Sequence, residues 1–125
     1  MSDEKQMDGG AVLSVDPATG GMKGSKLARF GMIPAKALQE LAEHYGKGEQ
    51  KYPTQPGEIP NFRKGYDWHL SFDAAMRHLN QFWQGEDIDD ETKSKHVIAA
   101  AWHCLCLATF MDEYRDGDDR ASTLR

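Results

Sequence analysis

Residues 97–111 are the most apolar stretch of this chain, and they limit its fold more than any other feature. The stretch contains Val97, Ile98, Ala99, Ala100, Ala101, Trp102, Leu105, Leu107, Phe110 and Met111. A helix that is apolar nearly all round is a buried helix. We therefore predict a helix over roughly residues 91–115 that lies inside the domain or against another subunit. No apolar run approaches the roughly 18–20 residues that a membrane span requires.

Two further helices are indicated by apolar residues that recur at helical spacing. The first should begin at Pro34, where the missing N–H costs no hydrogen bond, and stop before Pro53. The second should follow an N-cap at Ser71 and end at Gly85 in the C′ position. The two apolar stripes consist of Ala37, Leu38, Leu41, Ala42 and Tyr45, and of Phe72, Ala75, Met76, Leu79, Phe82 and Trp83. The sequence thus predicts an all-α fold with three main helices.

The other segments are rich in glycine, proline and polar residues. Residues 1–33 show no clear periodicity, so we predict an extended glycine-rich arm with a short hairpin and a strand at Ala11-Val12-Leu13. Residues 53–70 should form an irregular loop, of a length that is often functional. The polar tail from Arg115 onward is expected to fray. We divide the chain into a flexible arm (1–19), a helical domain (20–115) and a polar tail (116–125).

Charge and cysteine content exclude several classes of protein. The chain has 125 residues, with 15 Lys plus Arg, 20 Asp plus Glu and a net charge of -5. An acidic balance argues against a general nucleic-acid binder, although a local cluster of cations could still bind an anionic small molecule. The polar N-terminus is unlike a signal peptide. Cys104 and Cys106 lie on different sides of a helix and cannot bridge each other, so we expect a cytoplasmic protein. From the charge and the lengths of the apolar runs, we expect no membrane partner and no stable nucleic-acid partner.

Carboxylates that share a helix face are the first candidates for chemistry. Glu40 and Glu43 are three residues apart, so their side chains emerge side by side and would repel each other without a cation. Hard ions such as Mg²⁺ prefer oxygen ligands of this kind. A solvated helix face is the simpler interpretation of this pair. Asp73 is the third candidate, although it could equally favour the helix dipole and pair with Arg77 one turn on.

Cations and aromatic residues gather at positions that suit an anionic ligand. Lys23, Lys26 and Arg29 occur in the glycine-rich arm, where backbone can approach a phosphate. Lys47 and Lys51 end the first helix, where the helix dipole alone would explain them. Side chains of the long loop could hold a base by stacking and amide hydrogen bonds, or could simply cover a small core: Asn61, Phe62, Tyr66 and Trp68. No zinc motif, P-loop or catalytic triad is present in the sequence.

Several segments, in this order, resemble the phage dATP/dGTP diphosphohydrolase family. They are Gly20-Gly21-Met22-Lys23, Arg29-Phe30-Gly31-Met32-Ile33-Pro34, Ala37-Leu38-Gln39-Glu40-Leu41-Ala42, Tyr45-Gly46, Lys51-Tyr52, Asn61-Phe62, Asp73-Ala74-Ala75-Met76-Arg77-His78-Leu79, Gly85-Glu86-Asp87-Ile88-Asp89, Glu91-Thr92, His96 and Ala100-Ala101-Trp102. This family looks like a branch of the MazG-like all-α nucleoside triphosphate pyrophosphohydrolases. The resemblance implies a MazG-like helical bundle whose core is completed by oligomerisation, as a homodimer or tetramer.

The resemblance also implies an activity and a site. The expected reaction is hydrolysis of dGTP and dATP to the monophosphate and pyrophosphate, with two or more Mg²⁺ ions per site, for which Mn²⁺ could substitute. Glu40, Glu43 and Asp73 would hold the ions and serve catalysis. Glu49, Glu86, Asp87 or the substrate's phosphates could complete the metal shell. The implied substrate-binding residues are Lys23, Arg29, Lys51, Tyr52, Asn61, Arg77 and His78.

This sequence departs from the superfamily pattern at two acidic positions. Gln39 and Leu70 stand where the pattern Glu-Glu-x-x-Glu and Glu-x-x-Asp has acids. The alternative is therefore a non-catalytic helical nucleotide-binding or adaptor module that has lost metal ligands; a phosphatase that releases inorganic phosphate is a further competitor. Some relatives supply dGMP and deplete dATP for phages whose DNA contains 2-aminoadenine. If that role applies, the enzyme works in the cytoplasm of an infected host.

Overall fold

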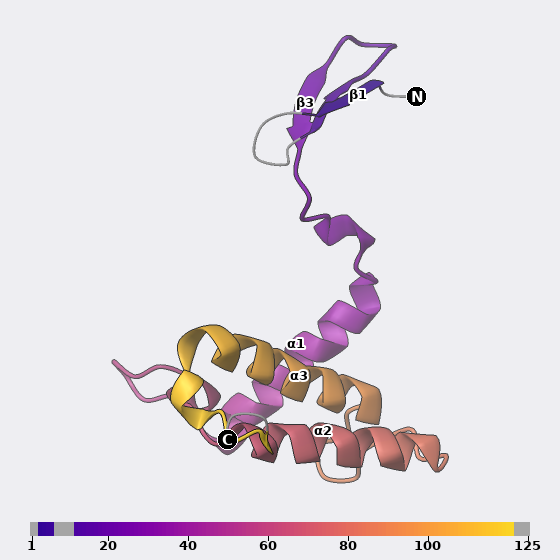
Figure 1. Ribbon diagram of the computed structural model, residues 1–125. Helices are drawn as coiled ribbons and strands as arrows, with labels where there is room; N and C mark the ends of the chain where they lie inside the picture. The colour runs from indigo at the N-terminus through magenta and orange to yellow at the C-terminus, as the bar shows by residue number, and fades with distance from the viewer. Residues whose placement is uncertain (1–2, 7–11, 122–125) are drawn as a thin grey trace. The chain divides into compact units, whose positions relative to one another are not determined.

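A computed structural model describes residues 3–6 and 12–121 of the chain. They form two compact units, which divide after Ala35. The first unit contains a three-stranded antiparallel sheet of order β1-β2-β3 (Figure 1). Its strands are β1 (Asp3–Gln6), β2 (Val12–Val15) and β3 (Met22–Ser25). The predicted hairpin and the strand at Val12 are confirmed, while Ala11 lies outside the described residues and the further strand β1 was not anticipated.

The turn between β2 and β3 is specified by its own side chains. The Asp16 carboxylate accepts the backbone N–H groups of Ala18 and Thr19, at 2.8 and 3.1 Å. Gly20 follows with a φ of 75°, a conformation that glycine adopts without strain. The register pairs Val12 with Ser25 and Val15 with Met22. After the sheet, the first unit holds a short 3₁₀ helix, Phe30–Met32.

The second unit contains the three predicted helices, so the prediction of a mainly helical fold is confirmed. They are α1 (Ala35–Lys51), α2 (Trp68–Trp83) and α3 (His96–Glu113). Helix α1 starts directly after Pro34 and stops two residues before Pro53, as the two prolines predict. Helices α2 and α3 pack along each other, and the 3₁₀ helix Asn61–Lys64 lies against α3 (Figure 1).

Helix α2 begins four residues earlier than its sequence predicts, and the expected N-cap at Ser71 is wrong. The Ser71 hydroxyl is fully buried and contacts the Tyr66 hydroxyl at 2.6 Å and Nδ1 of His103 at 3.0 Å. Because these side chains occupy it, the hydroxyl caps no backbone N–H. The C-terminal end is as predicted. Gly85 has a φ of 103°, and the N–H groups of Gly85 and Glu86 reach back to the carbonyls of Phe82 and Gln81 in a Schellman motif.

Helix α3 begins at His96, about five residues after the predicted start. Residues 89–95 form a tight turn instead. The Asp89 carboxylate accepts the backbone N–H of Thr92 at 3.0 Å and its hydroxyl at 2.7 Å, and the backbone N–H of Asp89 donates to the carbonyl of Ser94. Lys93 takes a positive φ of 63° within this turn. The hydrogen bonds between Asp89 and Thr92 therefore favour a turn over a helix at this point of the chain.

The core of the second unit lies where α2, α3 and the long loop meet. Trp68, Cys106 and Phe110 are buried at its centre. Partly buried residues pack around them: Phe62, Tyr66, Trp102, Leu107 and Tyr114. Helix α3 buries only one face in this arrangement, since Val97, Leu105 and Met111 stay exposed. None of the helices in residues 12–121 is long and apolar enough to cross a bilayer.

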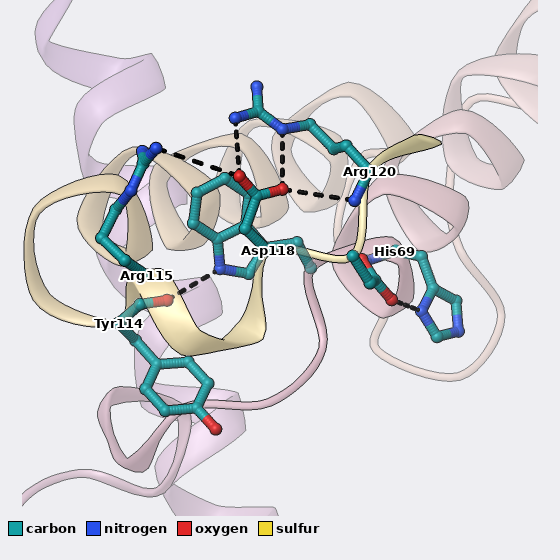
Figure 2. Close-up of polar contacts among 7 residues, drawn as sticks. His69, Tyr114, Arg115, Asp118 and Arg120 are labelled. Carbon is teal, nitrogen blue, oxygen red and sulfur yellow. Dashed lines mark hydrogen bonds and ion pairs between the residues drawn. The ribbon is translucent and has the colours of Figure 1, made fainter. Parts of the chain in front are cut away.

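The polar residues after α3 do not fray, contrary to the prediction, at least as far as Arg120. The indole N–H of Trp68 donates to the carbonyl of Tyr114 at 3.0 Å, and the guanidinium groups of Arg115 and Arg120 lie over the Trp68 ring. Figure 2 shows Asp118 between the two arginines, with bonds of 2.9 Å to Arg120. These contacts fasten the end of the described chain onto the start of α2.

Candidate functional site

The second unit contains a cavity of about 850 Å³, which is the candidate functional site. A volume of this size falls within the range of about 300–1,000 Å³ that is usual for ligand pockets. Its wall is built from the C-terminal half of α1, the Pro60–Phe62 segment, one face of α2, the turn after Ile88 and the middle of α3. The long loop, which the sequence marked as functional, supplies Pro60, Asn61, Phe62 and Tyr66 to this wall.

Five of the seven predicted substrate-binding residues line this cavity. Lys51 and Tyr52 come from the end of α1, Asn61 from the loop, and Arg77 and His78 from α2. These residues are up to 27 positions apart in sequence, and the fold brings them to one wall. The other two, Lys23 and Arg29, belong to the first unit.

The predicted metal ligands lie elsewhere. Glu40, Glu43 and Asp73 are not among the residues that line the cavity, and within the described residues they do not form one group of metal-ligating atoms. Glu40 pairs with Lys95 at 3.1 Å, and Glu43 accepts a hydrogen bond from Gln39 at 3.2 Å. Asp73 is exposed on α2. Their role as ligands therefore stays a prediction from the resemblance.

Cations line one part of the cavity. The Lys51 ammonium pairs with Glu91 at 3.0 Å, and Lys47 donates to the Ser94 hydroxyl at 3.0 Å. Arg77 forms no ion pair with any residue in the described part of the chain. Its guanidinium carries a fork of donors that suits phosphate oxygens. The wall can therefore meet an anion with Arg77, which has no ion-pair partner among the described residues, and with Lys51, whose pair with Glu91 is exposed.

Aromatic rings form another part of the wall. Trp102 is at its centre, with ring centroids 5.8 Å from Tyr45, 5.6 Å from Phe62 and 4.8 Å from His103. Such tilted and edge-to-face contacts hold the rings in fixed orientations. Tyr52 is more exposed and lies beside Asn61 in the lining. A planar base could stack against rings of this kind, with the Asn61 amide as hydrogen-bonding partner.

Three carboxylates line the cavity, and each of them has a partner within the protein. Glu49 accepts the backbone N–H and the hydroxyl of Thr54, which lowers its pKa. Glu91 pairs with Lys51. Asp89 is buried, which opposes ionisation, yet the hydrogen bonds from Thr92 and the nearby His78 and His96 bring its pKa below the usual value overall. Asp89 is thus held as an anion inside the wall.

Histidines are concentrated around the cavity. His44, His78 and His103 line it, and His96 lies behind His78 with no exposed surface. Burial lowers the pKa of His44 and His78, with a smaller contribution from a neighbouring cation in each case, Lys47 and Arg77 respectively. Burial also lowers the pKa of His103, to about 4. These rings are therefore neutral at pH 7, when they can both donate and accept hydrogen bonds.

Two groups of side chains in the described residues have ligand atoms close enough to share an ion. His78, Asp89 and His96 form a buried group at the cavity, and Asp67, His69 and Asp119 form a largely exposed one beside the start of α2. In the buried group the two Nδ1 atoms are in direct contact at 2.9 Å. In the exposed group the backbone N–H and the ring Nδ1 of His69 both bond to the Asp119 carboxylate. In the buried group, Asp89 accepts its hydrogen bonds from Thr92, outside the group.

The sequence did not point to Asp89, His44 or Ser71 as lining residues. The signal for Asp89 was present, since Asp followed three residues later by Thr is a spacing at which the aspartate accepts both Thr groups. His44 follows directly on Glu43 in α1, and its Nδ1 contacts the Ser94 hydroxyl at 2.8 Å, fifty residues away. No local pattern could reveal that contact, because it depends on how α1 meets the turn before α3.

Comparison with known families identifies the family of this chain. A family model described as "dATP/dGTP diphosphohydrolase, N-terminal" matches residues 17–120, which is most of the chain. The chain belongs to this family. Its members are hydrolases that act on purine deoxynucleoside triphosphates, so the predicted family and enzyme class are confirmed. Neither a search of curated proteins nor one of solved structures found a match.

Proposed function

We propose that the chain hydrolyses dGTP and dATP to the deoxynucleoside monophosphate and pyrophosphate, and that the substrate binds in the 850 Å³ cavity of the second unit. The observation that carries this proposal is the composition of one wall, which combines uncommitted positive charge with aromatic rings. A nucleoside triphosphate has the complementary parts, a polyanionic chain and a planar base. Family membership supplies the choice of purine deoxynucleotides.

The triphosphate lies, in this proposal, along the cations of α1 and α2. Arg77 makes bidentate contacts to phosphate oxygens, while Lys51 exchanges its exposed partner Glu91 for the substrate. That exchange is inexpensive, because an exposed ion pair contributes only about 0–1 kcal/mol. Lys23 and Arg29 belong to the first unit, and their role in substrate binding stays a prediction from the resemblance. As charge builds up on the phosphates in the transition state, these fixed cations stabilise it more than the ground state.

The base lies against the aromatic part of the wall. Tyr52 offers an exposed ring for stacking, and the Asn61 side chain has both an amide N–H and a carbonyl for the base edge. A purine presents more surface to such a ring than a pyrimidine. These two residues are therefore proposed as the source of base selection.

Divalent ions are part of the proposal. Glu40, Glu43 and Asp73 offer only oxygen atoms, the donor type that Mg²⁺ and Mn²⁺ prefer. We propose, on the resemblance alone, that they hold two or more ions, although the three side chains neither line the cavity nor form one group in this structure. A bound ion supplies positive charge against the phosphates and lowers the pKa of a coordinated water molecule. Replacing Glu40 by Gln tests this assignment, since the amide keeps the shape and removes the charge.

A homo-oligomer is proposed as the active form. Helix α2 exposes large apolar side chains, namely Leu70, Phe72, Met76, Leu79, Phe82 and Trp83, and Trp83 is 85% exposed. Helix α3 adds Val97, Leu105 and Met111. An apolar surface of this extent on neighbouring helices is typical of an interface. A dimer or tetramer would bury it and complete the core.

The pathway proposed for this activity is nucleotide supply during infection. Release of dGMP and removal of dATP would serve a phage that replaces adenine by 2-aminoadenine. The enzyme would then act in the cytoplasm of the host. A dATP pool that stays unchanged when the gene is expressed in a bacterium would contradict this role without affecting the proposed chemistry.

The proposed reaction is tested by incubating the purified protein with each of the four dNTPs and Mg²⁺ or Mn²⁺, and by resolving the products by ion-pair chromatography. We expect dGMP or dAMP together with pyrophosphate, and no product with EDTA. Intact triphosphates under every condition would favour a nucleotide-binding module. Inorganic phosphate as the first product would indicate a phosphatase.

A further inference from the structure

A continuous line of hydrogen-bonded side chains leads from the surface to the cavity. The Glu86 carboxylate lies 2.9 Å from Nε2 of His96, and Nδ1 of His96 lies 2.9 Å from Nδ1 of His78. His96 is fully buried between the other two residues, whereas about half of the Glu86 side chain is exposed. His78 is 5% exposed and lines the cavity. The line therefore runs Glu86–His96–His78–cavity.

The two rings meet head-on. The ring centroids are 5.2 Å apart and the Nδ1 atoms are 2.9 Å apart. The difference between these two distances equals the sum of the centroid-to-Nδ1 distances in the two rings, so the four points lie nearly on one line. Each Nδ1 therefore points at the other, as in an N–H···N hydrogen bond. An ion held by both nitrogens would need the rings to turn away from each other toward a common point. In this conformation the residues form a hydrogen bond and not a metal site.

The carboxylate at one end decides which nitrogen carries the proton at the other. An ionised carboxylate can only accept, so Nε2 of His96 must be the donor to Glu86. In a neutral His96, Nδ1 is then an acceptor, and the N–H between the rings must belong to Nδ1 of His78. A neutral His78 has only one ring proton. Its Nε2 is consequently left with a free lone pair.

The charges around His78 favour this neutral state. Arg77 on the same helix, His44 on α1 and His96 and His103 on α3 surround it, and among the described residues Asp89, in the turn before α3, is the anion that acts on the ring. Burial first, and Arg77 next, hold the pKa of His78 below its usual value. A ring of this kind does not bind a proton at pH 7, but it can accept one when a proton is released beside it.

We propose that His78 is the general base of the hydrolysis, and that His96 and Glu86 are positioning residues which fix its tautomer; this proposal rests on the function proposed above. The assignment differs from a role for His78 in substrate binding alone. It also gives a purpose to Glu86, whose charge lies 10 residues from His96 in sequence but directly behind it in the fold.

The proton transfer is balanced as follows. The oxygen of a water molecule forms a bond to the α-phosphorus, and the bond from that phosphorus to the α,β-bridging oxygen breaks. Pyrophosphate leaves with the electron pair of the broken bond. The proton lost by the water goes to Nε2 of His78, whose Nδ1–H stays bonded to His96. The positive charge on the imidazolium is stabilised through His96 by Glu86, and the proton then passes to solvent with product release.

The tautomers can be tested directly by NMR. Long-range ¹H–¹⁵N correlation spectra of the full chain at pH 7.5 should show His78 protonated at Nδ1 and His96 at Nε2. This result does not depend on activity. A proton on Nε2 of His78, or a doubly protonated His96, would overturn the proposal. His69→Gln, a change on the exposed first turn of α2, removes the His69 signal and so assigns it. It is the control that the spectra of His78 and His96 do not change when another histidine is replaced.

Kinetics test the base role. His78→Asn keeps an N–H donor near the position of Nδ1 but has no equivalent of Nε2, so kcat should fall by about 10²–10⁴-fold with little change in KM. Glu86→Gln retains the acceptor but loses the charge that stabilises the imidazolium, so kcat should fall less and the acidic limb of its pH profile should move to lower pH. His69→Gln should have the activity of the unmodified chain.

The outcomes separate this proposal from the proposed function. A wild-type chain that does not hydrolyse dNTPs refutes both. An active wild type with unchanged kcat in His78→Asn refutes the base role alone, as does a change confined to KM. A transition-metal ion bound between the two rings would also refute the base role. Co²⁺ titration tests this, because a Co²⁺ ion held by His78 would give a visible absorption that is absent in His78→Asn.

Discussion

Acid should destabilise this protein through His103, and the size of the effect follows from its surroundings. His103 lies on α3 between the cavity and the buried Ser71, and burial lowers its pKa from 6.5 to about 4. In the unfolded chain the ring regains the higher value. Between pH 6.5 and 4 the unfolded state therefore binds a proton that the folded state does not. Stability must fall as the pH falls through this window, and no further below it.

The loss can be estimated from the two pKa values. With 6.5 in the unfolded and about 4 in the folded chain, the free energy of unfolding at pH 5.0 is lower by about 2 kcal/mol than at pH 7.5. This is an upper value, because the ring retains some contact with solvent. Burial of His44 and His78 acts in the same direction. The contribution of His103 must therefore be isolated by a variant.

The assay is urea unfolding followed by tryptophan fluorescence at pH 7.5 and pH 5.0. In His103→Asn the amide can take the place of Nδ1 beside the Ser71 hydroxyl, but it does not titrate. We expect the wild type to lose more stability than the variant between the two pH values, by up to about 2 kcal/mol. Equal losses in the two proteins would refute the argument that burial keeps His103 neutral.

Three further predictions concern packing, substrate binding and assembly. Gly65→Ala should lower Tm, at a cost of about 1–3 kcal/mol or more, because the residue has a φ of 94° and the added Cβ would lie 2.7 Å from the Tyr114 ring. Gly57→Ala is the control, since Gly57 has a φ of 81° but open space around it and should lose less stability. Equal losses of Tm in the two variants would count against the packing argument. Arg77→Ala should raise KM for dGTP at least tenfold, which corresponds to about 1.4 kcal/mol of binding free energy, and its circular dichroism spectrum should stay unchanged. A KM equal to that of the wild type would show that Arg77 does not bind the phosphates. Light scattering should give a multiple of the 14.0 kDa chain mass, whereas a monomer at micromolar concentration would contradict the proposed oligomer.

The helices and their ends could be predicted wherever the signal is local. Pro34, Pro53 and Gly85 fix helix boundaries through their own backbone, so α1 and the end of α2 lie where the sequence places them. The start of α2 was misplaced because Ser71 is engaged by Tyr66 and by His103, which is distant in sequence. The start of α3 was misplaced although its signal is local, because the hydrogen bonds between Asp89 and Thr92 override the helical periodicity.

The candidate site was predictable in part for a similar reason. The family resemblance marked Lys51, Tyr52, Asn61, Arg77 and His78, and the fold brings these five to one cavity. The line from Glu86 through His96 to His78 was not predicted, because it joins the end of α2, the start of α3 and the middle of α2 through side chains alone. Exposed carboxylates gave the weakest inference, since Glu40, Glu43 and Asp73 are spread over the surfaces of α1 and α2.

The most direct test of the central claim is dGTP hydrolysis by the wild type and by Arg77→Ala in the presence of Mg²⁺, with dGMP and pyrophosphate quantified. The account predicts that the wild type releases the two products in equal amounts, that EDTA stops the reaction, and that Arg77→Ala loses at least tenfold in kcat/KM. Full activity in the variant would show that phosphates do not bind in the cavity. Unhydrolysed dGTP in the wild type would contradict the proposed function itself.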